Sequence, residues 1–117
     1  MDTPCRAGLS GSKLSAARIL NLSLGGLKFS CTRDAFHSMV PADQRTPGRV
    51  IDVMIELDFE LQLPGQSASA INTQATIIHS ERLSQDEFHI GVQFIGMDEA
   101  AFRVLRAYVE ARLSAQR

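Results

Sequence analysis

Residues 51–60 read Ile-Asp-Val-Met-Ile-Glu-Leu-Asp-Phe-Glu and carry the strongest strand pattern of the chain. Apolar residues alternate with mainly acidic ones, and a period of two is typical of a strand whose faces have different surroundings. One face would be buried and the other would be in water, which an antiparallel sheet tolerates. We therefore expect a strand over Val50–Leu63, with Ile51, Val53, Ile55, Leu57 and Phe59 directed into the core.

Shorter runs of similar pattern lie on both sides of this strand, separated by glycine, proline and other turn residues. The further predicted strands are Cys5–Leu9, Leu14–Leu22, Leu27–Thr32, Ala68–Glu81 and Phe88–Ile95. About six antiparallel strands over residues 5–95 indicate a small barrel or sandwich, and closure into a barrel would remove exposed edges. The irregular segment Arg33–Arg49 is expected to be a long loop, in which Asp34–Val40 makes a helical turn over one end of the core.

The hydrophobic period changes after the last strand. Asp98 is suited to cap a helix, and apolar residues then recur at steps of three and four. The sequence predicts one amphipathic helix over about residues 98–114, whose core-facing stripe is Phe102, Leu105, Val109 and Leu113. This helix would cover an open end of the barrel or mediate assembly.

Composition limits the classes of function. The 117 residues suggest a single domain over 1–117, and the net charge of −1 gives no overall basic field for a nucleic-acid polymer. Cys5 and Cys31 imply neither a disulfide framework nor a metal site, so both are expected to be reduced strand residues. Without a signal peptide or a long apolar run, we expect a cytoplasmic protein that does not insert into a membrane.

No catalytic constellation can be assembled from the sequence. The three histidines, at positions 37, 79 and 89, are scattered, and no nucleophile, base and orienting group fall together. The acidic residues at positions 52, 56, 58 and 60 are better explained as a hydrated strand face than as a metal site, and the arginines at 33, 45 and 49 as solvated loop charges. We expect no enzyme activity, no metal and no cofactor.

The turn Asn21-Leu-Ser-Leu-Gly-Gly, ending at Gly26, separates two predicted strands. The alternation before it would place Ala17, Ile19 and Asn21 on one face of the strand, opposite the side chains of Arg18, Leu20 and Leu22. Glycines permit a tight turn or a close approach, and Asn and Ser side chains bond to nearby backbone or to a ligand. The residues alone leave two interpretations open, a structural hairpin turn and a binding site.

The spacing Asn21-x-Ser23-x-x-Gly26, the late strand Gly91-Val92-x-Phe94 and the terminal helix together resemble the PilZ domain family, over about Cys5–Leu113. The resemblance implies a six-stranded antiparallel β-barrel with a C-terminal helix. It also implies a bacterial receptor for cyclic di-GMP, with Asn21, Ser23 and Gly26 as ligand-binding residues. Control of pili, flagella, biofilm or surface polysaccharide is the implied setting.

The chain departs from the family signature in one respect. No Arg-x-x-x-Arg lies before Asn21, where only Arg6 and Arg18 occur, too far apart for the motif and so weaker candidates as ligand contacts. The arginine pair is either missing or lies on a segment before Met1. Each charge-assisted contact is worth roughly 1.5–3 kcal/mol, so losing two costs on the order of two to four decades of affinity.

Two functions remain open. The first is a regulatory cyclic di-GMP-binding module that passes the second-messenger level to a protein partner or an attached domain. The alternative is a PilZ-like domain that binds no nucleotide and serves as an interaction or assembly adaptor. With either function, the C-terminal helix is a candidate surface for homo-oligomerisation.

Overall fold

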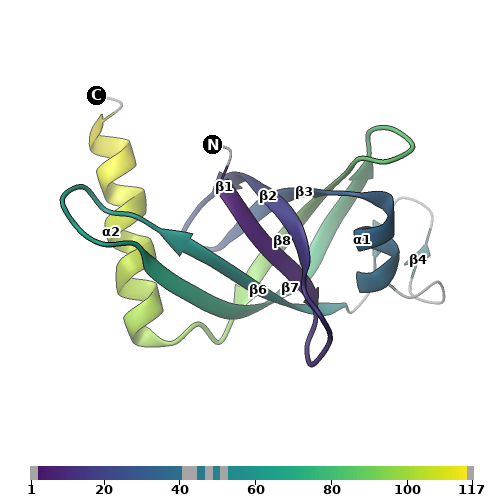
Figure 1. The fold of residues 1–117 in the computed structure, drawn as a ribbon, viewed down its shortest axis with the longest axis horizontal. Coiled ribbons are helices and arrows are strands. Elements are labelled where there is room, and N and C mark those ends of the chain that lie inside the picture. Colours follow the sequence, from purple (N-terminus) through teal and green to yellow (C-terminus); the bar gives the residue numbers. More distant parts are fainter. Residues whose placement is uncertain (1–2, 41–44, 47–48, 51–52, 116–117) are drawn as a thin grey trace.

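The computed structural model describes residues 3–40, 45–46, 49–50 and 53–115, and a β-barrel forms most of it (Figure 1). Its strands are β1 (Thr3–Leu9), β2 (Ser15–Leu22), β3 (Gly26–Cys31), β6 (Met54–Leu61), β7 (Ser69–Arg82) and β8 (Phe88–Ile95). They close in the order β1-β2-β3-β8-β7-β6, and every neighbouring pair is antiparallel. The expected six-stranded antiparallel barrel is confirmed.

Alternating residues of β6 and the residue before it supply the centre of the core, as the pattern over residues 51–60 predicts. Val53, Ile55, Leu57 and Phe59 are all buried. The regular strand is shorter than expected, because β6 begins at Met54 and Val50 belongs to a separate pair of short strands. That pair is β4 (Arg45–Thr46) and β5 (Arg49–Val50). Ile51 and Asp52 of the predicted strand lie outside the described residues.

The helical turn predicted after β3 is present as a helix, α1 (Arg33–Met39). Thr32 caps it by accepting a hydrogen bond from the backbone N–H of Ala35 at 3.2 Å. Phe36 stacks on Phe88 of β8, with ring centroids 4.3 Å apart. The prediction that this segment covers one end of the core is therefore confirmed, and the rest of the expected loop contains the strand pair β4 and β5.

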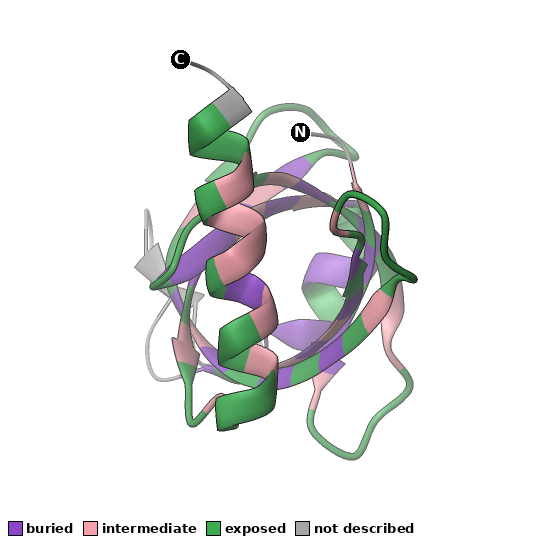
Figure 2. Ribbon diagram, turned by 90° about the vertical axis from the view of Figure 1, so that its left-hand side faces the viewer, coloured by how far each residue is buried: buried purple, intermediate pink, exposed green. Residues whose placement is uncertain are grey.

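Helix α2 (Glu99–Ala115) crosses the opposite end of the barrel from α1 (Figures 1 and 2). The predicted cap is present, since the Asp98 carboxylate accepts from the backbone N–H of Ala101 at 2.7 Å. Neither helix of the described chain combines the length and the apolar character that a membrane span requires.

The face that α2 turns to the barrel differs from the predicted stripe. Leu105 is completely buried and Val109 packs partly against the core, but Phe102 is 38% exposed and Leu113 is 57% exposed. Tyr108 takes part in the contact instead. The residues of α2 that pack against the core lie between Ala101 and Val109, and the C-terminal end of the helix projects beyond the barrel (Figure 1).

The two cysteines face the barrel interior. Cys5 and Cys31 are buried and have free thiols. Burial raises the pKa of the Cys31 thiol to about 12. Burial also raises the pKa of Cys5 to about 12, with a smaller contribution from the neighbouring Cys31. Both thiols therefore behave as small apolar core groups rather than as nucleophiles.

Candidate functional site

Asn21 faces outward because β2 contains a β-bulge. Ile19 pairs with Phe29 of β3 and Asn21 pairs with the next residue, Lys28, so Leu20 is an extra residue on its strand. The extra residue reverses the alternation. The expectation that Asn21 shares the inward face of Ile19 is therefore wrong: Ile19 is buried and Asn21 is exposed. Among the described residues, nothing hydrogen-bonds to the Asn21 side chain.

Ser23 closes the turn between β2 and β3. Its backbone N–H donates to the Gly26 carbonyl at 2.9 Å, and its hydroxyl donates to the same oxygen at 3.1 Å. The hydroxyl also accepts from the Gly26 N–H at 3.3 Å. The tip of the turn is tied to β8, because Phe94 N–H donates to the Gly25 carbonyl at 2.9 Å. The polar group of Ser23 thus serves the turn itself.

Gly26 is required by the packing of β3 on β8. A Cβ atom at this position would lie 2.0 Å from the carbonyl oxygen of Val92, well inside any real contact distance. The neighbouring Gly25 has open space at the same position, with nothing within 4 Å. The glycine at the end of the motif therefore has a structural reason that does not depend on a ligand.

The barrel surface next to the turn forms a shallow groove. Strand register places Asn21 beside Lys28, and Lys28 beside Gly91 of β8. A second bulge, in β7, leaves Ile78 63% exposed at the far side of Gly91. The groove has a volume of about 440 Å³ and is lined by Asn21, Ser23, Gly25, Gly26, Leu27, Lys28, Ile78, Gly91, Val92 and Gln93.

Lys28 and Ile78 were not singled out from the sequence. Lys28 brings a positive charge to the groove, and it forms no ion pair within the described parts of the chain. The signal for Lys28 was available, because its position on the polar face of β3 is part of the alternation. The signal for Ile78 was not, because the bulge that exposes it cannot be read from the apolar run in which it lies.

A second pocket adjoins the groove on the side of α2. Its volume is about 270 Å³, and it is lined by Leu20, Asn21, Leu22, Tyr108, Val109, Arg112 and Leu113. Asn21 lines both this pocket and the groove. Arg112 lies over the Tyr108 ring, 5.7 Å from its centroid, and donates to the Tyr108 hydroxyl at 3.3 Å.

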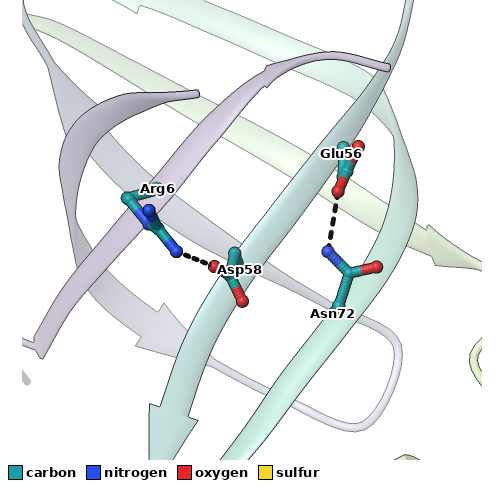
Figure 3. Close-up of polar contacts among 4 residues, drawn as sticks. All are labelled: Arg6, Glu56, Asp58 and Asn72. Carbon is teal, nitrogen blue, oxygen red and sulfur yellow. Dashed lines mark hydrogen bonds and ion pairs between the residues drawn. The ribbon is translucent and has the colours of Figure 1, made fainter. Parts of the chain in front are cut away.

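Arg6 lies on another part of the barrel. It forms an ion pair with Asp58 on the outer face of β1 and β6, where Asn72 also donates to the Glu56 carboxylate at 2.8 Å (Figure 3). Arg6 lines a different cleft, of about 710 Å³, which contains none of the motif residues. Glu56 and Asp58 of the acidic face are thus engaged in polar contacts, whereas Asp52 lies outside the described residues. The described residues hold no group of three or more side chains suited to a metal.

Arg18 and Arg33 do not line the groove. Arg18 is exposed on β2, paired in register with Pro4 and Ser30. The spacing Arg-x-x-x-Arg occurs once in the chain, at Arg45 and Arg49, after the turn rather than before it. Their strands pair near α1, at the opposite end of the barrel from α2 (Figure 1). The structure therefore brings together Asn21, Ser23 and Gly26 but neither of the weaker arginine candidates.

Comparison with known proteins gives a family. The model of the PilZ domain family matches residues 1–111. Among solved structures, the Borreliella burgdorferi PlzA protein in complex with c-di-GMP is similar in fold, with a TM-score of 0.58 and 14% sequence identity over 98% of this chain. This chain covers 46% of the length of that protein. A search of curated proteins found no match to this chain. The extent of the family match and the barrel both lead to one conclusion: the chain belongs to the PilZ domain family.

Proposed function

We propose that this PilZ domain is a regulatory module that binds cyclic di-GMP and passes the level of this second messenger to a partner protein or an attached domain. The observation that carries the proposal is the groove at the motif turn, where the β2 bulge directs Asn21 outward beside Lys28. Family membership supports it, as does the fold shared with a protein whose structure contains c-di-GMP. The proposed site of action is the cytoplasm, without catalysis or a cofactor.

The groove offers a matching contact for each part of the ligand. The Lys28 ammonium would attract a phosphate, and the Asn21 amide would hydrogen-bond to a guanine edge. Gly91 has no side chain, so the ligand approaches the sheet closely there, and exposed Ile78 gives an apolar surface for a base. Ser23 and Gly26 would act mainly by holding the turn in place, because their polar groups bond to each other.

Titration calorimetry with cyclic di-GMP up to high micromolar concentration tests this function. Wild-type protein is expected to bind. Asn21→Ala should weaken binding about 2- to 10-fold, which corresponds to the loss of one neutral hydrogen bond. Lys28→Gln should weaken binding more than this, because a charge-assisted contact is stronger than a neutral one. Asn72→Ala is the matched control, since Asn72 bonds to Glu56 outside the groove. Absence of binding by the wild-type chain would end the receptor proposal.

The adaptor function stays as the second candidate, favoured by two exposed apolar side chains of α2. Phe102 and Leu113 are both exposed, and at 3.6 residues per turn they lie on the same side of the helix. Light scattering after gel filtration tests self-association through this face. The adaptor would be favoured if the wild type is a dimer that binds no nucleotide and the double variant Phe102→Ser, Leu113→Ser is a monomer.

A further inference from the structure

We propose that Arg112 of α2 binds a guanine base in the pocket between the helix and the β2 bulge. The C-terminal helix would thereby supply a guanidinium next to the motif turn, from a position outside the family's Arg-x-x-x-Arg signature. The inference rests on the proposed function, because it concerns the same ligand. It adds a contact residue on α2 and a reason for guanine specificity.

The pocket combines apolar walls with polar side chains, as a purine site requires. Its walls include apolar side chains from both elements, namely Leu20, Leu22, Val109 and Leu113. Its polar side chains also come from both elements, since Asn21 belongs to β2 and Arg112 to α2. A purine has flat apolar faces and a polar edge, so it fits between apolar walls with its edge toward the two polar side chains.

The guanidinium of Arg112 is already held in position. It lies 5.7 Å from the centroid of the Tyr108 ring and donates from one nitrogen to the Tyr108 hydroxyl at 3.3 Å. In the described part of the chain Arg112 has no acidic partner, so its other N–H groups remain available for a ligand. By contrast, Arg103 and Arg106 of the same helix pair with Glu99 and Glu110. Prior positioning reduces the entropy lost when the base binds.

Guanine suits this guanidinium better than phosphate or adenine does. Helix α2 ends at Ala115, and a helix C-terminus carries partial negative charge that disfavours a phosphate nearby. The O6 and N7 atoms of guanine are two adjacent acceptors that match the arginine fork, whereas adenine presents one acceptor and one donor. Lys28 lies in the adjoining groove, where the phosphate of the same ligand would bind.

Titration of cyclic di-GMP and cyclic di-AMP into three variants tests the inference. Arg112→Gln should weaken cyclic di-GMP binding between roughly 5-fold and 150-fold, the value of one bidentate pair, and should reduce the preference over cyclic di-AMP. Arg112→Lys should also weaken binding, because lysine has no planar fork. Arg106→Gln is the control on the same helix, with an expected change below about 2-fold.

The results separate the guanine contact of Arg112 from the proposed binding of cyclic di-GMP. If the wild type binds but Arg112→Gln behaves like Arg106→Gln, the guanine contact is wrong and the proposed function stands. If Arg112→Lys binds as the wild type does, the contact is with charge alone and guanine recognition is refuted. If the wild type does not bind, both proposals fall. Arg112 is exposed, and unchanged thermal unfolding of its variants will show that lost affinity is not lost folding.

Discussion

Two adjacent glycines at the motif turn should respond in opposite directions to the same substitution. In Gly26→Ala the new methyl would start 2.0 Å from the Val92 carbonyl oxygen, and contacts below 3.0 Å are essentially never observed for a real Cβ. Backbone must therefore move by about 1 Å between β3 and β8. In Gly25→Ala the methyl meets nothing within 4 Å, and Gly25 is not among the positive-φ glycines of the described chain.

The expected free-energy changes follow from these distances. Overpacking of this kind costs about 1–3 kcal/mol, a large part of the roughly 5–15 kcal/mol that stabilises a small domain. Gly25→Ala should instead stabilise by about 0.4–1 kcal/mol, because alanine restricts the unfolded chain. The chain has no tryptophan and one tyrosine, so urea unfolding is best followed by far-UV circular dichroism. The midpoint of Gly26→Ala should fall by about 0.5–2 M relative to wild type.

Equal midpoints for the two alanine variants would refute the close approach of β3 to β8. A second check is ligand binding. If Gly26→Ala unfolds at a lower urea concentration than wild type but binds cyclic di-GMP normally at low temperature, the glycine serves the fold alone, as its packing indicates. If it stays stable and loses binding, the glycine contacts the ligand instead.

Three further predictions concern the core and α2, each followed by urea unfolding. Because the folded pKa values of Cys5 and Cys31 are raised to about 12 from 9.0, stability is fully present below pH 9 and is lost as the pH rises toward 12; alanine at both positions should flatten this dependence. Leu105→Ala should cost about 2–5 kcal/mol, but Phe102→Ala under about 1 kcal/mol, and reversed values would contradict the observed orientation of α2. Asp98→Ala should lower the free energy of unfolding by about 0.5–2 kcal/mol, because the helix cap is lost. An unchanged free energy of unfolding would show that Asp98 does not stabilise the helix as a cap.

The parts of the fold that sequence predicted were those with local causes. Alternation over Val53–Phe59 identified the buried face of β6 because each side chain is directed by its own position in the strand. Asp98 marked the start of α2 because a cap bonds within its own first turn. The turn with Ser23 and Gly26 was visible for the same reason, since its hydrogen bonds join residues three apart.

The parts that sequence missed depend on contacts between distant segments. A bulge at Leu20 is imposed by the pairing of β2 with β3, so the outward direction of Asn21 could not be read from alternation. The orientation of α2, with Phe102 outward and Tyr108 toward the barrel, depends on how the helix crosses the barrel mouth. Gly91 and Arg112, which line the groove and the pocket together with Asn21, belong to a strand and a helix far along the chain.

The close packing at Gly26 has a consequence for how much the family motif says about ligands. Two of its three residues, Ser23 and Gly26, are needed for the turn and for strand packing whether or not a nucleotide ever binds. A match at Ser23 and Gly26 therefore indicates that the chain forms the barrel, but it says little about whether the barrel binds a nucleotide. Asn21 is the motif residue whose side chain has no bonding role inside the described chain. A search for PilZ domains that bind nucleotide should therefore give most weight to this position and to the cations around it.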